Sequence, residues 1–403
     1  MKLVPKNLAV ANIKYFTLSF ALLFLFLTKA FGQKNVNEVY QDLVKHEYER
    51  ILNAAKKYLL DEPVTITSTS STRSAGGKHD FFSEGDYWWP DPQNPQGAYI
   101  QKDGLTNPDN FVSHRKAMVN FSIKSSTLVA AYKISSDEKY AQHAIKHFNA
   151  WFVNEETKMN PHLLYAQAIK GRFTGRGIGI IDTIHLIEVA QSILVLEKFG
   201  VISREELNAI KKWFKEYLNW LTTHKYGIDE MNAKNNHGTC WVMQVAAFAK
   251  LVNDEEKLEF CRNRYKEILL PNQMASDGSF PLELSRTKPY NYSLFNLDAM
   301  AAICQILSTQ KENLWSFSLA DGRNLKRGIE FMYPYIMNKS EWNYKPDVMY
   351  FEFYPVRHPS LIFAGAAYEE HKFIALWKVL DADPTNEEVI RNFPIRQPIL
   401  WIN

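Results

Sequence analysis

The positions of apolar side chains along this chain predict a protein built mainly of helices. Between Ile180 and Leu194, apolar residues recur every three or four positions, the spacing that gives a helix one continuous apolar face. Similar patterns predict helices over residues 36–60, 113–134, 138–152, 180–199, 204–222, 237–252, 255–269, 293–308, 325–337 and 361–377. Strand patterns are short and weak, and the clearest of them covers residues 348–353. We therefore expect an all-α protein of paired helices.

Nothing in the sequence divides these helices into separate units. There is no internal repeat and no linker rich in proline, glycine and serine. We therefore expect residues 33–403 to form a single domain, which is long enough to bury a sizeable core. The cysteines Cys240, Cys261 and Cys304 match no zinc motif, and they favour buried thiols over a disulfide framework.

The first residues have the organisation of a secretory signal peptide. Lys2, Lys6 and Lys14 precede an apolar run from Tyr15 to Leu27, and small residues follow that run. An uncleaved membrane anchor is the alternative, but the run is short for a membrane span. We expect residues 1–32 to be removed and the mature protein to be exported, either to the periplasm or out of the cell, without further membrane attachment.

Charge and composition exclude some partners and leave others open. The formal net charge is +3, from 47 basic and 44 acidic residues, and no long basic run is present, which argues against nucleic-acid binding. A slightly basic protein can still attract an acidic polymer into a locally positive cleft. The histidines show no metal-ligand spacing. We expect a monomer that uses neither a metal nor another cofactor.

Long loops between the helices are the places to search for a functional site. The longest covers residues 61–111 and contains Trp88 and Trp89 together with several prolines and glycines. A structureless loop of that length is uncommon in a compact domain unless it serves a site. The other informative loops cover residues 170–179, 229–236 and 274–292.

The segment Asn235-Asn236-His237-Gly238 directly precedes an apolar helical run. Its simplest interpretation is structural, with Asn236 as the N-cap and His237 in the first turn. A functional interpretation is compatible with this one, because a helix N-terminus and an amide donor both favour a bound carboxylate. Histidine is a common general acid or base in enzymes, so His237 is a candidate to take or hold a proton.

A second segment runs from Asp277 to Arg286 and leads to Tyr290 and Tyr292. Taken singly, Arg286 would form a surface ion pair with a residue such as Glu283, and either tyrosine would be a half-buried ring. Taken together, these residues suit one task. Arg286 offers a bidentate fork for a carboxylate. We expect a tyrosine hydroxyl beside that cation to have a lowered pKa and to carry a proton.

Aromatic residues in the longest loop indicate a sugar-binding cleft. Trp88 and Trp89 are adjacent and therefore project differently, which makes both of them awkward as core residues. At least one of them is expected to line a cleft, together with Tyr87. His79 lies earlier in the same loop and joins the candidate substrate-binding residues.

Glycines surround one further cation in the segment Gly175-Arg176-Gly177-Ile178-Gly179. A phosphate-binding loop is not expected there, because the segment lacks a preceding strand and a P-loop lysine. Close packing is the simpler reason for these glycines. Arg176 is then expected to reach the cleft.

Together these segments resemble the alginate lyase family of polysaccharide lyases. The resemblance is carried by Tyr87-Trp88-Trp89-Pro90-Asp91-Pro92, Asp103-Gly104, Asn107-Pro108, Gly179-Ile180-Ile181-Asp182-Thr183, Asn235-Asn236-His237, and the stretch from Asp277 through Glu283, Leu284, Arg286 and Tyr292 to Leu297. These pieces extend over residues 75–300. The resemblance implies an incomplete (α/α) toroid whose helix hairpins surround a deep cleft. It is closest to a divergent branch that includes glucuronan-cleaving enzymes.

The resemblance also implies an active centre. The family's catalytic Asn-His pair, Arg and Tyr correspond to Asn236, His237, Arg286 and Tyr292. The gap between the last two is a residue shorter than in the best-known members, so Tyr290 is the reserve candidate. Asn235 joins the substrate-binding residues. Such a site implies β-elimination of alginate, or alternatively of glucuronan, with Tyr292 or His237 as the base and a 4,5-unsaturated product.

Two other classes of protein remain open at this point. Helical toroids also host inverting glycoside hydrolases, which need two carboxylates about 6.5–9.5 Å apart. Asp80, Asp86, Glu283 and Asp298 are available for that role, but none has a distinctive partner or spacing. A non-catalytic glycan-binding protein would use the same aromatic and cationic residues without needing proton-transfer groups.

Overall fold

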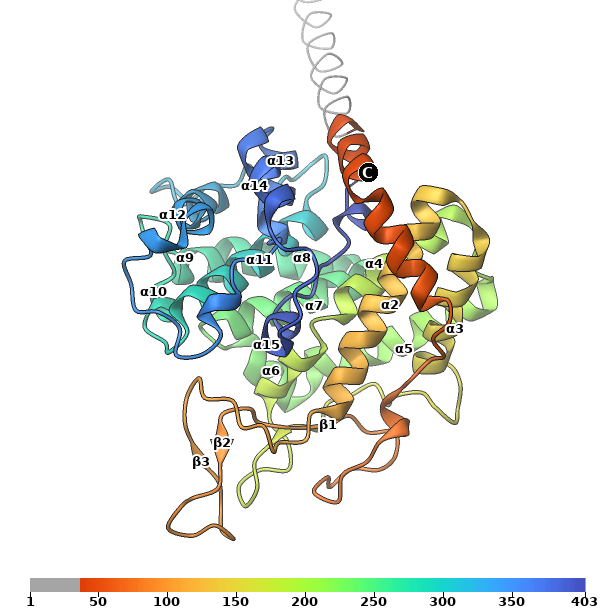
Figure 1. Ribbon diagram of the computed structural model, residues 1–403, viewed down its shortest axis with the longest axis vertical. Helices are drawn as coiled ribbons and strands as arrows, with labels where there is room; N and C mark the ends of the chain where they lie inside the picture. Colours follow the sequence, from red (N-terminus) through yellow and green to blue (C-terminus); the bar gives the residue numbers. More distant parts are fainter. Residues whose placement is uncertain (1–36, 403) are drawn as a thin grey trace, which may run out of the picture.

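The computed structural model describes residues 37–402, and the expected signal peptide, residues 1–32, lies outside them. The described chain is mainly helical, as predicted (Figure 1). Its α-helices are residues 37–58, α2 (Ser113–Ser135), α3 (Glu138–Phe152), α4 (Leu186–Phe199), α5 (Arg204–Thr223), α6 (Lys225–Met231), α7 (Asn236–Val252), α8 (Glu255–Arg264), α9 (Leu270–Gln273), α10 (Pro281–Leu284), α11 (Pro289–Leu307), α12 (Leu325–Met337), α13 (Pro359–Ala367), α14 (His371–Val379) and α15 (Glu387–Arg391).

Short elements complete the fold. The tighter or wider helical turns are η1 (Ile66–Ser68), η2 (Gly177–Thr183), η3 (Tyr265–Leu269), η4 (Lys339–Glu341), η5 (Phe351–Phe353) and η6 (Pro398–Leu400). The strands are β1 (Phe82–Glu84), β2 (Trp88–Trp89), β3 (Ile100–Gln101) and β4 (Tyr165–Ala168). Strand β1 pairs in parallel with β4, and β2 pairs antiparallel with β3. The loop 61–111 is therefore not structureless, because it contains η1 and three of these strands.

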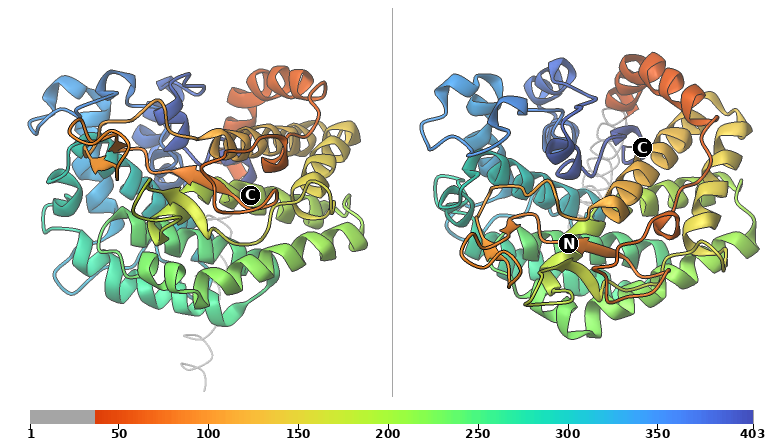
Figure 2. Two further views of the ribbon diagram at one scale, coloured as in Figure 1. Left: turned by 90° about the horizontal axis from the view of Figure 1, so that it is seen from below. Right: turned by 60° about the horizontal axis from the view of Figure 1, so that its bottom comes forward.

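The long helices form two layers. Helices α2, α4, α7, α11 and α13 contact one another in that order, and α3, α5, α8, α12 and α14 pack against them. Figure 2 shows this curved array, with the orange segment that precedes α2 crossing it. The turn η6 contacts α2, α4 and α13, so the C-terminal segment lies between the two ends of the array. This arrangement is the incomplete (α/α) toroid that the sequence predicted.

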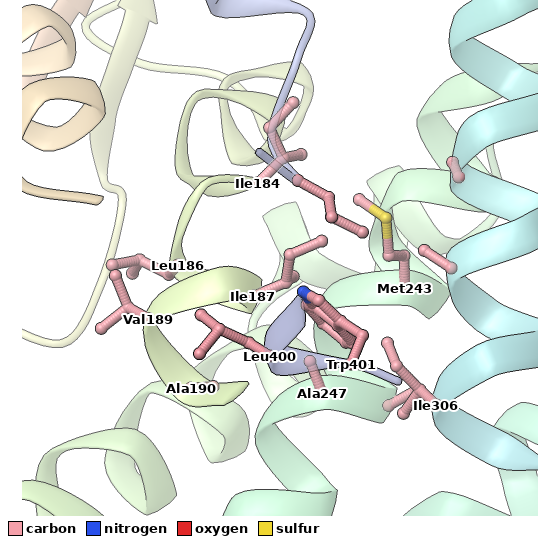
Figure 3. Close-up of a cluster of buried hydrophobic side chains, with 14 of the residues drawn as sticks. Ile184, Leu186, Ile187, Val189, Ala190, Met243, Ala247, Ile306, Leu400 and Trp401 are labelled. Atoms are coloured by element: carbon pink, nitrogen blue, oxygen red, sulfur yellow. The ribbon is translucent and has the colours of Figure 1, made fainter. Parts of the chain in front are cut away.

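The core lies between the inner helices. Helices α7 and α11 are buried along almost their whole length, which agrees with their apolar sequence on every side. Figure 3 shows Ile187 of α4, Ala247 of α7 and Ile306 of α11 around Trp401 near the C-terminus. All four side chains are buried. Helix α5 is amphipathic instead, and Ser203 caps its N-terminus by accepting a hydrogen bond from the Glu206 N–H.

Some predicted elements differ in the structure. The predicted helix 180–199 is divided into η2 and α4, and the predicted helix 361–377 is divided at a turn where Glu369 has a positive φ. The predicted strand 348–353 is wrong, because this segment contains η5 and no ladder. Its apolar residues do not form one buried face, because Phe351 packs edge-on against Tyr290, while Val348 and Phe353 are exposed.

Candidate active site

One cavity, with a volume of about 490 Å³, gathers most of the residues singled out in the sequence. Its walls come from the β2–β3 hairpin and β4, from η2, α6, α7, α11 and α15, and from the segment between α10 and α11. The predicted residues that line it are Tyr87, Trp88, Arg176, Asn235, Asn236, His237, Arg286 and Tyr292. Residues separated by about two hundred positions in the sequence therefore share one cavity.

Three predicted residues do not line this cavity. The Trp89 ring lies on the β2–β3 hairpin, where its Nε1 donates a hydrogen bond to the Leu105 carbonyl at 2.9 Å. Tyr290 is fully buried, and its hydroxyl donates to the Tyr335 carbonyl at 3.0 Å. His79 bonds the Lys158 carbonyl through Nδ1 at 2.7 Å. Trp89 and Tyr290 thus point away from the cavity that Trp88 and Tyr292 line. Tyr290 is a core residue, so its assignment as the reserve catalytic tyrosine is wrong.

The N-terminus of α7 places His237 in the cavity wall. Asn235 is the N-cap and Asn236 the first helical residue, one position earlier than the sequence predicted. His237 Nδ1 lies 2.6 Å from Oε1 of Glu230, a buried carboxylate on α6. A carboxylate accepts at neutral pH, so Nδ1 donates and Nε2 carries the free lone pair. The next position requires a glycine, Gly238, because a Cβ there would lie 2.2 Å from the Ala233 carbonyl oxygen.

Asn236 is held by a carboxylate from a different part of the chain. Its backbone N–H donates to Glu283 Oε1 at 2.7 Å, and its side-chain amide donates to Glu283 Oε2 at 2.6 Å. Glu283 on α10 thus satisfies a free N–H in the first turn of α7 and fixes the amide that faces the cavity. Burial raises the pKa of Glu283, while the hydrogen bonds from Asn236 oppose that shift.

Arg286 forms an ion pair that the sequence did not predict. The Nη2 atom of its guanidinium lies 3.0 Å from Oδ1 of Asp103. The partner expected from the sequence was the nearby Glu283. Asp103 also accepts a hydrogen bond from the Thr287 hydroxyl at 2.9 Å. The Arg286 guanidinium carbon lies 4.8 Å from the centre of the Tyr292 ring. The cation is therefore held rigidly beside the phenol.

The predicted lowering of the Tyr292 pKa is wrong. Burial raises its pKa above the ordinary tyrosine value, and the hydrogen bond from Tyr87 and the charge of Arg286 only partly oppose this. The two phenol oxygens, of Tyr292 and Tyr87, are 2.8 Å apart. Sequence shows a nearby cation, but it does not show how deeply the hydroxyl is buried. Tyr292 is therefore a protonated phenol at neutral pH.

The cation Arg176 faces the cavity next to a tryptophan. Its Nε donates to the Gln167 carbonyl at 2.9 Å, and its guanidinium carbon lies 5.8 Å from the centre of the Trp88 ring. Burial lowers the pKa of Arg176 to about 10, so it remains charged at neutral pH. Close packing explains the neighbouring glycine, because a Cβ on Gly179 would lie 2.5 Å from the Ala166 Cβ.

Metal and membrane features are limited within the described chain. Among residues 37–402, no group of three or more His, Cys, Asp or Glu side chains is placed to hold a metal ion. Over the same residues, no individual helix has the length and apolar composition to cross a membrane, although η2 and α4 meet those criteria as a bent pair. Cys240, Cys261 and Cys304 are buried free thiols.

Comparison with known proteins agrees with this arrangement. The family model described as alginate lyase matches residues 65–342, which is more than half of the chain. The chain belongs to the alginate lyase family. It is therefore a polysaccharide lyase, as the sequence predicted. No curated protein sequence matches it significantly.

Solved structures show the same fold. An alginate lyase from Bacteroides ovatus is 30% identical, with a TM-score of 0.78 over 92% of this chain and 97% of that one. Two variants of alginate lyase A1-III, each complexed with a tetrasaccharide, are both 14% identical. One gives a TM-score of 0.55 over 87% of this chain and 94% of that one, and the other gives 0.54 over 91% and 94%. At this lower identity the likeness concerns the fold.

In this lyase, the C-terminal segment beyond the family match also reaches the site. Arg391 of α15 lines the cavity and lies 2.9 Å from Asp86, which Arg115 contacts at 2.5 Å. Burial alone would raise the pKa of Asp86, but these two cations lower it to about 2. Asp86 is thus ionised at neutral pH and is unsuited to the general-acid role of an inverting hydrolase.

The other three carboxylates considered for hydrolysis are absent from the cavity wall. Glu283 is bonded to Asn236, Asp298 accepts from His358 and Ser360, and Asp80 accepts from Asn160. Glu230 and its neighbour Asp229 line the cavity and were not among the candidate residues from the sequence, and Glu230 contacts His237. An acidic residue seven positions before His237 was the available signal, but its side chain reaches the imidazole only because α6 turns back onto α7.

Proposed function

We propose that this lyase cleaves alginate, a polymer of mannuronate and guluronate, by β-elimination. The observation that carries the proposal is that one cavity contains an amide, a fixed guanidinium, an imidazole and a protonated phenol. In this reaction a base removes the C5 proton, the C4–O4 bond breaks, and O4 leaves with a proton. The likeness to the Bacteroides ovatus alginate lyase supports alginate as the polymer. Glucuronan is the alternative polymer.

Charge stabilisation is the first requirement of this chemistry. Removing the C5 proton beside a carboxylate builds a dianionic, enolate-like intermediate, and fixed donors aimed at that charge are the largest source of rate enhancement in such sites. Asn236 supplies an amide whose position Glu283 fixes, and Arg286 supplies a cation whose position Asp103 fixes. Because both donors are already held in place, the protein need not reorganise as the charge develops.

Binding of a neighbouring uronate is assigned to Arg176 and Trp88. Within residues 37–402, Arg176 forms no ion pair with a carboxylate, whereas Arg286 and Arg391 both do. The Arg176 guanidinium can therefore bind the carboxylate of the substrate. Trp88 offers a flat ring for the face of a sugar, and Arg172 lies on the same ring at 5.4 Å. Together they would orient an acidic sugar next to the cleaved bond.

Proton transfer is divided between two residues. Glu230 holds the Nδ1 proton of His237, which leaves Nε2 free to accept the C5 proton. Tyr292 keeps its proton in the resting enzyme and donates it to O4. On guluronate, the C5 hydrogen and O4 lie on opposite faces of the ring, which suits two separate groups. On mannuronate and glucuronate they lie on the same face, where Tyr292 can take the C5 proton and return it to O4 only after it has given up its own proton.

A panel of polymers tests the substrate. Polymannuronate, polyguluronate and glucuronan are incubated separately with the protein, and formation of the conjugated double bond is followed by ultraviolet absorbance. We expect turnover of at least one of the two alginate polymers at a higher kcat/KM than turnover of glucuronan. Faster cleavage of glucuronan would overturn alginate as the substrate, and binding without turnover of any polymer would overturn the lyase assignment.

A further inference from the structure

A buried lysine lies behind the two phenols of the site. Lys288 is fully buried at the N-cap of α11 and does not line the cavity. Its Nζ lies 3.0 Å from Glu388 Oε1 and 3.4 Å from the Tyr87 hydroxyl, and it faces the Tyr350 ring at 4.9 Å. An ammonium group is costly to bury unless it is paired and hydrogen-bonded. The Glu388 pair offsets this cost, but it does not explain the contact with Tyr87.

The contact with Lys288 determines the direction of the hydrogen bonds. An ammonium group has donors and no acceptor, so Tyr87 accepts from Lys288. The hydrogen of Tyr87 is then available for Tyr292, whose oxygen is 2.8 Å away. Tyr292 in turn accepts from Tyr87, which leaves its own hydrogen free to point into the cavity. The opposite direction would leave the Tyr87 hydrogen without an acceptor among these three groups.

We propose that Lys288 is a positioning residue that fixes this chain of hydrogen bonds so that Tyr292 presents its proton to the departing O4. This inference rests on the proposed function, because it requires Tyr292 to be the proton donor. When the C4–O4 bond breaks, O4 takes the bonding electrons and the phenol proton, and the negative charge passes to the Tyr292 oxygen. The Tyr87 hydroxyl then donates to that phenolate, and the ammonium of Lys288 stabilises it through Tyr87.

The charged groups around this chain of hydrogen bonds have opposite effects on a Tyr292 phenolate. Arg286 favours a phenolate on Tyr292, whereas Glu388 and Asp103 oppose it. Arg391 lies 3.2 Å from Glu388 and 2.9 Å from Asp86, so the Glu388 charge is shared with a second cation. Lys288 therefore retains positive charge toward Tyr87. Helix α15 therefore contributes in two ways, through Glu388, which holds Lys288, and through Arg391 in the cavity wall.

The variant Lys288→Met tests the inference, because it removes the charge and keeps a long side chain. We expect kcat on the polyuronate to fall about tenfold to a hundredfold, the loss of one charge-assisted hydrogen bond, with KM nearly unchanged. A second substrate, a uronide carrying para-nitrophenoxide at C4, has a leaving group that needs no proton. On that substrate the loss should largely disappear, whereas a merely structural defect would lower both rates equally.

Tyr87→Phe provides a second test that leaves the Lys288–Glu388 pair intact. It should show the same dependence on the leaving group, and adding Lys288→Met to it should cause little further loss. Lys250→Met is the matched control, since Lys250 is a largely buried lysine on α7 that donates to the Ile306 carbonyl. The control should leave kcat unchanged on both substrates.

Equal losses on both substrates, for Lys288→Met or for Tyr87→Phe, would overturn the inference. So would an effect confined to KM. The wild-type protein is assayed in parallel for unsaturated product. If the wild type makes none, the proposed function itself fails. If the wild type is active but the variants lose the same rate on both substrates, only the role of Lys288 is contradicted.

Discussion

Replacing Tyr292 by Phe is expected to lower kcat on the polyuronate by about 10²–10⁴-fold and to leave KM nearly unchanged. The substitution removes the hydroxyl that donates to O4, but it keeps the ring beside Arg286. Steady-state rates from ultraviolet absorbance measure the effect. Tyr290→Phe is the matched control, because Tyr290 lies two residues away and its hydroxyl bonds the Tyr335 carbonyl instead of facing the cavity.

The control should reduce stability slightly and leave kcat unchanged. Full activity of Tyr292→Phe would show that another group protonates O4. The pH profile provides a second comparison. Burial raises the pKa of Tyr292 above its ordinary value, so the proton donor is present at neutral pH and is lost only as pH rises through that raised pKa. The wild type should therefore lose no activity through Tyr292 ionisation below about pH 10.

Replacing His237 by Ala is expected to lower kcat on polyguluronate by about 10²–10⁴-fold, because Nε2 is the group assigned to remove the C5 proton there. The loss on polymannuronate should be smaller, since there the C5 proton and O4 leave from the same face and the proposal assigns both transfers to Tyr292. Rates on the two polymers, each measured relative to the wild type, give this ratio directly.

His79→Ala is the control for His237, because His79 belongs to the candidate residues from the sequence yet lies outside the cavity wall. It should leave both rates unchanged. Like His237→Ala, Glu230→Gln should lower the rate more on polyguluronate than on polymannuronate, because the carboxylate sets the tautomer of the imidazole. Equal losses of His237→Ala on the two polymers would contradict the division of acid and base between two residues.

The sequence predicted the helical fold because apolar periodicity is a local property. Helix α7 starts within a residue of its predicted position, and its first turn contains the predicted His237. Division of the predicted helix 180–199 depends instead on how η2 packs against β4 and α6, which involves residues distant in sequence. The rejected strand 348–353 shows the same limit, since Phe351 packs against Tyr290, a residue distant in sequence, and not against a neighbouring strand.

Most of the site residues predicted from the sequence do line the cavity, but their partners could not be predicted. Arg286 pairs with Asp103, a residue 183 positions away, and although Asp103-Gly104 carries part of the family resemblance, no local pattern pairs it with Arg286. Glu283 was considered as a surface partner of Arg286 and instead caps α7 through Asn236. The predicted direction of the Tyr292 pKa shift is wrong for a related reason, because the burial of the hydroxyl depends on the assembled fold. Partners, burial and hydrogen-bond direction are tertiary properties.

We expect this lyase to break a polyuronate by elimination and not by addition of water. The most direct test digests alginate with the protein in water enriched in heavy oxygen and determines product masses together with ultraviolet absorbance. Every cut should give one unsaturated end, lighter by one water molecule than a hydrolysis product, with no heavy oxygen incorporated by the cleavage. Saturated ends that carry solvent oxygen would contradict the account.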